Sequence, residues 1–227
     1  MFMLKIVGLM EKSTLHWDRP SAVVFLPECN FSCIHCNQWR LVHEWQRMPT
    51  LDEKSVLRRI ARSRDVIDGV VITGGEPLIH NLDDFIREVK GYGLPIKVET
   101  NGFFSDYLMR LLRIGMIDFA SVDIKAPLKP GKYSQVCGVP VDTTEIALTI
   151  YKLIHSDYDY EFTMTPIPRI HTALDVEEVA KSIQGAKKFV LQWFEPSYKM
   201  EDAIPFTPEE MERFKDIASE YVKTEIR

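Results

Sequence analysis

The sequence predicts an α/β fold built on a parallel β-sheet, and three observations lead to this prediction. Short apolar, β-branched runs recur along the chain and indicate strands. The segments between these runs space their apolar residues as amphipathic helices do. The composition, with 45% hydrophobic and 27% charged residues, is that of an ordinary globular protein. Six alternating units of this kind form either a doubly wound sheet or a partial α/β barrel, and periodicity does not choose between the two.

The strands are predicted from runs of consecutive apolar residues. Residues 22–26 and 70–72 are typical of strands that are buried on both faces. Such strands pair in parallel and are joined by right-handed crossover connections. The six predicted strands begin near Ala22, Gly69, Ile96, Phe119, Tyr160 and Lys188.

The helices are predicted from single apolar stripes, which lie in residues 56–60, 82–89, 146–154 and 214–221. Capping boxes predict where helices begin, because a side-chain oxygen at the cap and an acid three residues later satisfy free backbone amides. Four such patterns are present: Thr50 with Glu53, Asp142 with Glu145, Asp175 with Glu178, and Thr207 with Glu210.

The chain has 227 residues, and no Gly/Ser-rich or Pro-rich linker divides it. We therefore expect a single domain over residues 1–227, large enough to bury a substantial core. Residues 1–18 are expected to add an N-terminal strand or hairpin, and residues 207–223 a closing helix.

Charge and hydropathy disfavour several classes of protein. The longest apolar runs are far shorter than the ~20 residues that span a bilayer, so no membrane segment is expected. The N-terminus lacks the features of a signal peptide, which favours a cytoplasmic location. With 28 basic and 33 acidic residues, the net charge of −5 gives no overall attraction to nucleic acid.

Three of the four cysteines are clustered as Cys29-x3-Cys33-x2-Cys36, directly after the first predicted buried strand. In a reducing compartment this clustering indicates a metal rather than disulfides. A closed zinc site needs a fourth ligand, for which His35 and Cys137 are the candidates. A 4Fe-4S cluster held by three cysteines instead leaves one iron open to a substrate.

A second motif, Gly74-Gly75-Glu76-Pro77, follows the strand at residues 70–73. The glycines let a ligand approach the backbone, Glu76 supplies a carboxylate for an amino group, and Pro77 fixes the turn. The alternative is an ordinary turn in which Glu76 meets solvent.

The two motifs together resemble those of the radical S-adenosylmethionine superfamily. The resemblance implies a partial (β/α)6 TIM-like barrel in which Cys29, Cys33 and Cys36 bind a 4Fe-4S cluster. It also implies that Gly74, Gly75, Glu76 and Pro77 bind the amino group of S-adenosylmethionine and that His35 covers its adenine. Members of the superfamily reductively cleave S-adenosylmethionine to a 5′-deoxyadenosyl radical that abstracts hydrogen.

Further segments resemble the glycyl-radical-enzyme activating proteins, most of all the branch that activates anaerobic ribonucleoside-triphosphate reductase. They are Glu99-Thr100-Asn101-Gly102, the segment from Val122 to Leu128, and Val190 to Phe194. The implied substrate is a glycine of a partner enzyme, and the implied electron donor is a flavodoxin or ferredoxin. Thr100 and Asn101 would bind polar groups of S-adenosylmethionine.

Asp123 and Lys125 are two residues apart at the end of a predicted strand, so their side chains face the same side. The resemblance implies that Lys125 reaches the S-adenosylmethionine carboxylate and that Asp123 lies at a neighbouring polar site. The simpler interpretation is a local ion pair. The segment Asn101-Gly102 could form a hairpin turn, but the helical spacing of residues 106–112 favours a loop leading to a helix.

The sequence also departs from its relatives and leaves other functions open. Glu28 precedes Cys29 where relatives have glycine, and Cys137 is interpreted as a small buried apolar residue. One alternative is a small-molecule radical enzyme such as 7-carboxy-7-deazaguanine synthase, which implies a pterin pocket and Mg²⁺. A non-enzymatic alternative is a zinc or iron-sulfur binding module, which leaves residues 74–77 unexplained.

Overall fold

The computed structural model describes residues 4–227, and contacts divide the chain into two compact units. The first unit comprises Met1–Asn30, Gln38–Thr100 and Asp106–Ala120, and the second comprises Phe31–Asn37, Asn101–Ser105 and Ser121–Arg227. The organisation of residues 1–227 as a single domain remains a prediction. Residues 1–3 of the expected N-terminal extension lie outside the described residues.

The strands follow one another in the sheet in their order along the chain, from β1 to β8. Within the units, β2 pairs in parallel with β3, β3 with β4, β6 with β7 and β7 with β8, whereas β1 is antiparallel to β2. A doubly wound sheet reverses its strand order at a switch point, whereas a barrel is wound in one direction. The predicted α/β fold with parallel strands is therefore confirmed, and the strand order is that of the barrel alternative. The bounds are β1 Gly8–Ser13, β2 Ser21–Leu26, β3 Gly69–Gly74, β4 Ile96–Thr100, β5 Phe119–Asp123, β6 Tyr160–Met164, β7 Phe189–Leu191 and β8 Thr224–Ile226.

Helices occupy most of the connections between the strands. The α-helices are α1 Trp39–His43, α2 Glu53–Ser63, α3 Asp83–Gly91, α4 Ser105–Arg113, α5 Pro130–Cys137, α6 Thr143–Ile154, α7 Ala173–Ser182 and α8 Pro208–Ser219. Short 3-10 turns cover Trp45–Arg47, Pro77–Ile79 and Tyr198–Met200. The expected closing helix corresponds to α8, which ends at Ser219 and is followed by β8.

The helix starts agree with the predicted caps in part. Thr207 caps α8 in a capping box with Glu210, and Asp142 caps α6. The cap of α2 is Asp52 rather than Thr50, and its side chain accepts a hydrogen bond from the Ser55 amide. Asp175 does not cap α7; it is the third helical residue, in a box with Thr172. In both misassigned cases another capping residue lies within three positions, so the sequence offered two possible starts.

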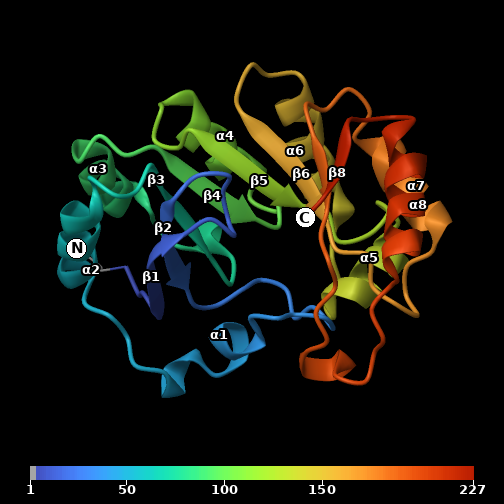
Figure 1. The fold of residues 1–227 in the computed structure, drawn as a ribbon, viewed down its shortest axis with the longest axis horizontal. Helices are drawn as coiled ribbons and strands as arrows, with labels where there is room; N and C mark the ends of the chain where they lie inside the picture. The colour runs from blue at the N-terminus through green and yellow to red at the C-terminus, as the bar shows by residue number, and fades with distance from the viewer. Residues whose placement is uncertain (1–3) are drawn as a thin grey trace. The chain divides into compact units, whose positions relative to one another are not determined.

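The first unit has a sheet whose two faces carry different residues. Val23, Val71 and Lys97 lie on neighbouring strands in matched register, so they share one face, which we call the inner face. Trp17, from the loop between β1 and β2, packs on Val23 and Val71 there. The alternating residues of β2, β3 and β4, such as Val24 and Ile72, point to the opposite face, and Figure 1 shows α2 and α3 beside these strands.

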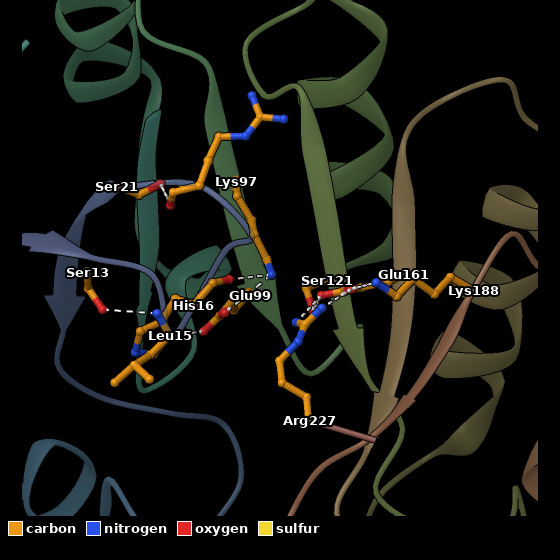
Figure 2. Close-up of polar contacts among 11 residues, drawn as sticks. Ser13, Leu15, His16, Ser21, Lys97, Glu99, Ser121, Glu161, Lys188 and Arg227 are labelled. Carbon is orange, nitrogen blue, oxygen red and sulfur yellow. Dashed lines mark hydrogen bonds and ion pairs between the residues drawn. The ribbon is translucent and has the colours of Figure 1, made fainter. Parts of the chain in front are cut away.

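The second unit contains a buried carboxylate on β6. Glu161 is 2% exposed, and both of its oxygens accept hydrogen bonds from the Arg227 guanidinium, at 3.2 and 3.3 Å. The Ser121 hydroxyl also donates to it at 3.1 Å, and Lys188 lies 3.7 Å away (Figure 2). A buried charge needs partners of this kind, so the network stabilises β6 beside β7 and β8.

Among the described residues, no helix has both the length and the apolar character needed to cross a membrane.

Candidate active site

The loop that follows β2 begins with a residue in a strained conformation. Glu28 has a φ of 65°, in the left-handed region that favours glycine, and its amide donates to the Leu41 carbonyl at 3.0 Å. Cys29 follows it and is half-buried, with its Sγ 3.9 Å from the Asn30 side-chain oxygen. Glu28 therefore forms this backbone turn at a cost in strain, because its side chain disfavours the left-handed region.

Gly74 and Gly75 allow the end of β3 to approach the chain before Cys29. The Gly75 amide donates to the Leu26 carbonyl at 2.8 Å, and the Glu76 amide donates to the Glu28 carbonyl at 2.7 Å. A Cβ atom built on Gly75 would lie 1.8 Å from the Glu28 oxygen, and one on Gly74 would lie 2.4 Å from the Leu26 oxygen. The sequence predicted a close approach by a ligand at this segment; the structure shows a close approach by the protein's own backbone.

Glu76 and Thr100, two of the predicted cofactor-binding residues, meet in the first unit. The Glu76 side chain is fully buried, and its Oε1 accepts a hydrogen bond from the Thr100 hydroxyl at 2.7 Å. The same oxygen accepts from the Leu78 amide at 3.0 Å, at the start of the turn that contains Pro77. Glu76 therefore does not simply meet solvent, and its carboxylate is held in one orientation between β3 and β4.

In the second unit, the segment that carries Cys33 and Cys36 is docked on the C-terminal end of α5. The Ser32 amide donates to the Cys137 carbonyl at 2.8 Å, and the Ile34 amide donates to the Val136 carbonyl at 3.1 Å. Gly138 ends α5 with a φ of 68°, and a Cβ atom built on it would lie 2.2 Å from the Ser32 oxygen. Glycine at position 138 is thus required for this docking.

The docking brings Cys33 next to Cys137, a contact that the sequence did not reveal. Both side chains are buried. The interaction with the Cys137 thiol lowers the pKa of Cys33, burial opposes the effect, and the positive charge of Lys125 adds to it. The predicted burial of Cys137 is correct, but its thiol has a polar partner. Cys33 is consequently biased toward the thiolate that metal binding requires.

Asp123 is the last residue of β5, and Lys125 follows two residues later. Their side chains lie together, as their spacing predicts. The Lys125 ammonium is 2.5 Å from Asp123 Oδ2, and the Lys125 amide donates a hydrogen bond to the Tyr133 hydroxyl oxygen at 3.2 Å. Although burial opposes the charge, the Asp123 carboxylate raises the pKa of Lys125 well above its usual range. The other carboxylate oxygen, Asp123 Oδ1, is buried without a hydrogen-bond partner. The local ion pair between Asp123 and Lys125 is therefore present, and Asp123 Oδ1 remains available to accept a hydrogen bond.

Two histidines of the second unit also carry a buried nitrogen without a partner, His35 at Nδ1 and His171 at Nε2. Burial lowers the pKa of His35 well below its usual range, and the positive charges of Lys125 and His171 act in the same direction. His171 is 4% exposed, and its Nδ1 accepts a hydrogen bond from the Ile167 amide at 2.9 Å. Burial lowers its pKa to about 4. His171 follows β6 in a loop and belongs to none of the recognised motifs, so nothing in the sequence pointed to it.

Asn101 and Gly102 begin the connection from β4 to α4 rather than a hairpin. The Asn101 side-chain oxygen accepts a hydrogen bond from the Phe103 amide at 3.0 Å, and α4 starts at Ser105. The Thr149 hydroxyl donates to the Gly102 carbonyl at 2.7 Å. The preference for a loop followed by a helix is confirmed.

The described residues thus assemble two groups of candidate side chains. The first unit brings Glu76 to Thr100, and the second brings Cys33, Asp123, Lys125 and His35 into one electrostatic neighbourhood. Within the described part of the chain, no three His, Cys, Asp or Glu side chains are close enough together to hold a metal ion. Cys29, Cys33 and Cys36 are all reduced thiols rather than half-cystines.

Comparison with known proteins places these residues in a family. The model of the radical SAM superfamily matches residues 23–183, which include both motifs. A Methanocaldococcus jannaschii protein named "Putative glycyl-radical enzyme activating enzyme MJ1227" is 27% identical over 230 residues, covering 96% of this chain and 92% of that protein. The 7-carboxy-7-deazaguanine synthase of Rhodospirillum rubrum is 36% identical over 84 residues, which cover 37% of this chain and 34% of that enzyme.

A solved structure has the same fold. Streptococcus suis SuiB bound to S-adenosylmethionine superposes with a TM-score of 0.69 at 11% sequence identity. The superposition covers 90% of this chain and 51% of that one, so the present chain spans about half the length of SuiB. The family model matches more than half of the chain and contains both motifs. The chain therefore belongs to the radical SAM superfamily.

Proposed function

We propose that the protein activates a glycyl-radical enzyme by abstracting hydrogen from a backbone glycine, with anaerobic ribonucleoside-triphosphate reductase as the partner. The observation that carries the proposal is the similarity over 96% of this chain to the Methanocaldococcus jannaschii protein named "Putative glycyl-radical enzyme activating enzyme MJ1227". The choice of the reductase as partner rests on the segments that resemble that branch. The Asp123–Lys125 pair supports it, because the segment from Val122 to Leu128 is the one that resembles this branch.

The residues present fit a 4Fe-4S cluster and S-adenosylmethionine. Three reduced cysteines lie within an eight-residue segment, and thiolate sulfur is the usual ligand of such clusters. His35 Nδ1 and Asp123 Oδ1 are buried without partners, which a polar ligand would satisfy. In this proposal Cys29, Cys33 and Cys36 hold the cluster. Gly74, Gly75, Glu76 and Pro77 bind S-adenosylmethionine together with Thr100, Asn101, Lys125 and His35.

A cluster held by these cysteines would supply the electron for the reductive cleavage of S-adenosylmethionine. The protein's own groups bind and orient the reactants. Lys125 remains an ammonium that attracts a carboxylate, because Asp123 keeps its pKa high. Glu76 accepts an amino group in a fixed direction, because the Thr100 hydroxyl and the Leu78 amide hold its carboxylate. The amides of Gly75 and Glu76 donate to the carbonyls of Leu26 and Glu28, so the backbone just before Cys29 is held against the segment that carries this carboxylate.

The proposal includes the cellular setting in which such an enzyme acts. We propose a cytoplasmic location and a flavodoxin or ferredoxin as the electron donor. The reduced form must meet its partner enzyme through a transient interface, because each activation leaves the radical on the partner.

Electron paramagnetic resonance tests the proposal. The reconstituted protein is reduced anaerobically and mixed with S-adenosylmethionine and the reductase subunit from the same host. A glycyl doublet is expected, together with 5′-deoxyadenosine, and the Cys33→Ala variant should give neither. Formation of 5′-deoxyadenosine without a doublet would show that the radical chemistry is right and the partner wrong. Absence of both from the wild type would favour a zinc or iron-sulfur binding module.

A small-molecule radical enzyme related to 7-carboxy-7-deazaguanine synthase is the second candidate. It is favoured by the 36% identity to the Rhodospirillum rubrum enzyme, but that similarity covers only 37% of this chain. Incubation of the reduced protein with S-adenosylmethionine, Mg²⁺ and a reduced pterin substrate tests it. Consumption of the pterin in place of a glycyl doublet would make this the correct function.

A further inference from the structure

A histidine and a carboxylate that the proposed function does not use are paired in the first unit. His16 Nδ1 is 2.9 Å from Glu99 Oε2, and the Lys97 ammonium is 3.6 Å from Glu99 Oε1 (Figure 2). Lys97 also donates to the main-chain oxygen of His16 at 2.6 Å. The side chain of Lys97 is 1% exposed, so its charge is matched by these two acceptors. The loop carrying His16 is thereby fixed to β4 at two points.

The pair lies on the inner face of the sheet, near the carboxyl ends of the strands. Glu99 is two residues from Lys97 along β4, and the two side chains therefore share that face. His16 packs edge-on against Phe25, with 5.8 Å between the ring centres, and Phe25 is in register with Thr73 of β3. Glu99 immediately precedes Thr100, whose hydroxyl binds Glu76. In parallel α/β sheets, ligands bind at this end of the strands.

The charges of the pair favour a neutral binding partner. Burial opposes ionisation of Glu99, but the hydrogen bond from His16 and the charge of Lys97 lower its pKa, so it is a carboxylate. The positive charge of Lys97 balances that carboxylate. With a neutral imidazole the group therefore has no net charge, and it would not select an ionic ligand.

The orientation of the imidazole decides which hydrogen bond it offers. A carboxylate accepts only, so Nδ1 of His16 must carry the hydrogen that is donated to Glu99. In the neutral ring Nε2 is then an acceptor. One quarter of each of the two side chains remains exposed, which leaves the pair accessible to a ligand on the inner face. A carboxylate that fixes the tautomer of a histidine in this way leaves the far nitrogen ready for a defined partner.

We propose that His16 is a substrate-binding residue whose Nε2 accepts a hydrogen bond from a backbone N–H of the glycine-bearing peptide segment. Glu99 acts as the positioning residue that holds the ring. A peptide amide is a neutral donor, and one lies directly beside the glycine carbon that must be presented for hydrogen abstraction. This inference rests on the proposed function, because it assigns to the inner face the peptide that an activating enzyme must admit.

Two substitutions separate substrate binding from a structural role. His16→Asn keeps an N–H near the position of Nδ1, so it can still bind Glu99, but it has no acceptor at the position of Nε2. His16→Gln places an amide group near the position of Nε2. His155→Asn is the matched control, since His155 is exposed at the end of α6 and its Nδ1 binds only its own helix at the Tyr151 carbonyl.

The experiment measures KM for the reductase subunit by the yield of glycyl radical, together with 5′-deoxyadenosine formed in the absence of the partner. His16→Asn should raise KM about five- to tenfold, which is the worth of one hydrogen bond. Partner-independent 5′-deoxyadenosine formation, S-adenosylmethionine affinity and the urea midpoint should not change. His16→Gln should recover part of the affinity, and His155→Asn should match the wild type.

Three results would overturn the inference, and the experiment distinguishes them. If the wild type forms the glycyl radical and His16→Asn has an unchanged KM, His16 does not bind the substrate. If His16→Gln has a higher KM than His16→Asn and a lower urea midpoint, the His16–Glu99 pair only stabilises the loop that carries His16. If the wild type cleaves S-adenosylmethionine but forms no glycyl radical on the reductase, the proposed function itself fails, and the assignment of a peptide to His16 fails with it.

Discussion

Gly75 has no room for a side chain, because the backbone before Cys29 lies against it. We expect Gly75→Ala to lower the free energy of unfolding by about 1–3 kcal/mol, as overpacking usually does, since its Cβ would lie 1.8 Å from the Glu28 oxygen. The loop must move to relieve this overlap. Urea denaturation gives the loss of stability, and iron content after reconstitution reports on the displaced cysteine.

Gly91 provides the control for this substitution. It ends α3, and an added Cβ atom would meet nothing within 4 Å. Gly91→Ala should leave stability unchanged or raise it slightly, because alanine reduces the entropy of the unfolded chain. Equal losses at the two positions would contradict the close approach described at Gly75.

Glu28 offers the opposite case, a side chain at a position that suits glycine. Its φ of 65° costs about 1 kcal/mol or more for a residue with a Cβ atom. Glu28→Gly should therefore leave the free energy of unfolding unchanged or raise it by up to about 1 kcal/mol, since relief of strain offsets the added entropy of the unfolded chain. Glu28→Val should lower it, because a β-branched residue tolerates this conformation worst. Thermal unfolding of the two variants distinguishes these outcomes.

His171 makes the stability of the protein depend on pH. Its folded-state pKa is about 4, compared with 6.5 for an unperturbed histidine, because burial disfavours its charged form. As the pH falls below 6.5, His171 binds a proton in the unfolded state but not in the folded state. Its contribution to the free energy of unfolding is therefore fully present above pH 6.5 and is lost progressively down to pH 4. The full loss is about 3 kcal/mol.

The variant His171→Asn isolates this contribution from that of other acid-sensitive groups. Asparagine can still accept the hydrogen bond from the Ile167 amide, but it does not titrate. The variant should lose less stability than the wild type between pH 7 and pH 4 in urea denaturation. Parallel pH profiles would mean that His171 is not the group responsible.

At the scale of the helix, the two candidate starts of α2 make different predictions. Asp52 accepts the Ser55 amide in the structure, so Asp52→Ala should cost about 1 kcal/mol of stability. Thr50 lies outside the helix and is exposed, so Thr50→Ala should have little effect. A larger loss at Thr50 would restore the cap predicted from sequence. Urea denaturation of both variants decides between them.

The sequence predicted the elements whose apolar residues follow a clear periodic pattern. Examples are the buried strands β2 and β3 and the amphipathic helices α2 and α8. Helix α5 was missed because Pro130, Gly131 and Ser134 weaken its helical signal, and its buried residues Tyr133 and Val136 pack under the cysteine segment. Strand β8 was missed because it has only three residues, and its pairing with β7 is what defines it.

At the scale of the whole molecule, the proposed cluster with one open iron would make the protein sensitive to oxygen. The anaerobically reconstituted protein should lose its brown colour and iron content in air, because Cys29 and Cys36 are only half-buried. Absorbance at about 400 nm and iron analysis over time measure the loss. Iron that persists through prolonged exposure to air would contradict an open cluster and favour a closed metal site with four protein ligands.

The candidate site could be predicted from sequence where its chemistry is local. The three clustered cysteines, residues 74–77 and the pair Asp123 and Lys125 are each visible within one short segment. The partners that act on them are not, because they come from distant parts of the chain. Cys137 reaches Cys33 through the docking of a loop on a helix, and His16 reaches Glu99 through the loop after β1. Such contacts depend on tertiary structure, which no local pattern encodes.

The order of the strands also bears on how the chain folds during synthesis. Each new strand from β2 to β8 pairs with the one made before it, so no strand has to wait for a partner that is still untranslated. Pairing partners such as Ser21 and Gly69 are nevertheless far apart in the chain, so each parallel pairing must close a long crossover connection and is slow to form. Nascent proteins fold from the N-terminus, and this strand order suits that direction. The cysteine segment is the exception. It emerges after β2 but binds the end of α5, about a hundred residues later, so its thiols stay exposed to oxidants until the middle of the chain has been made.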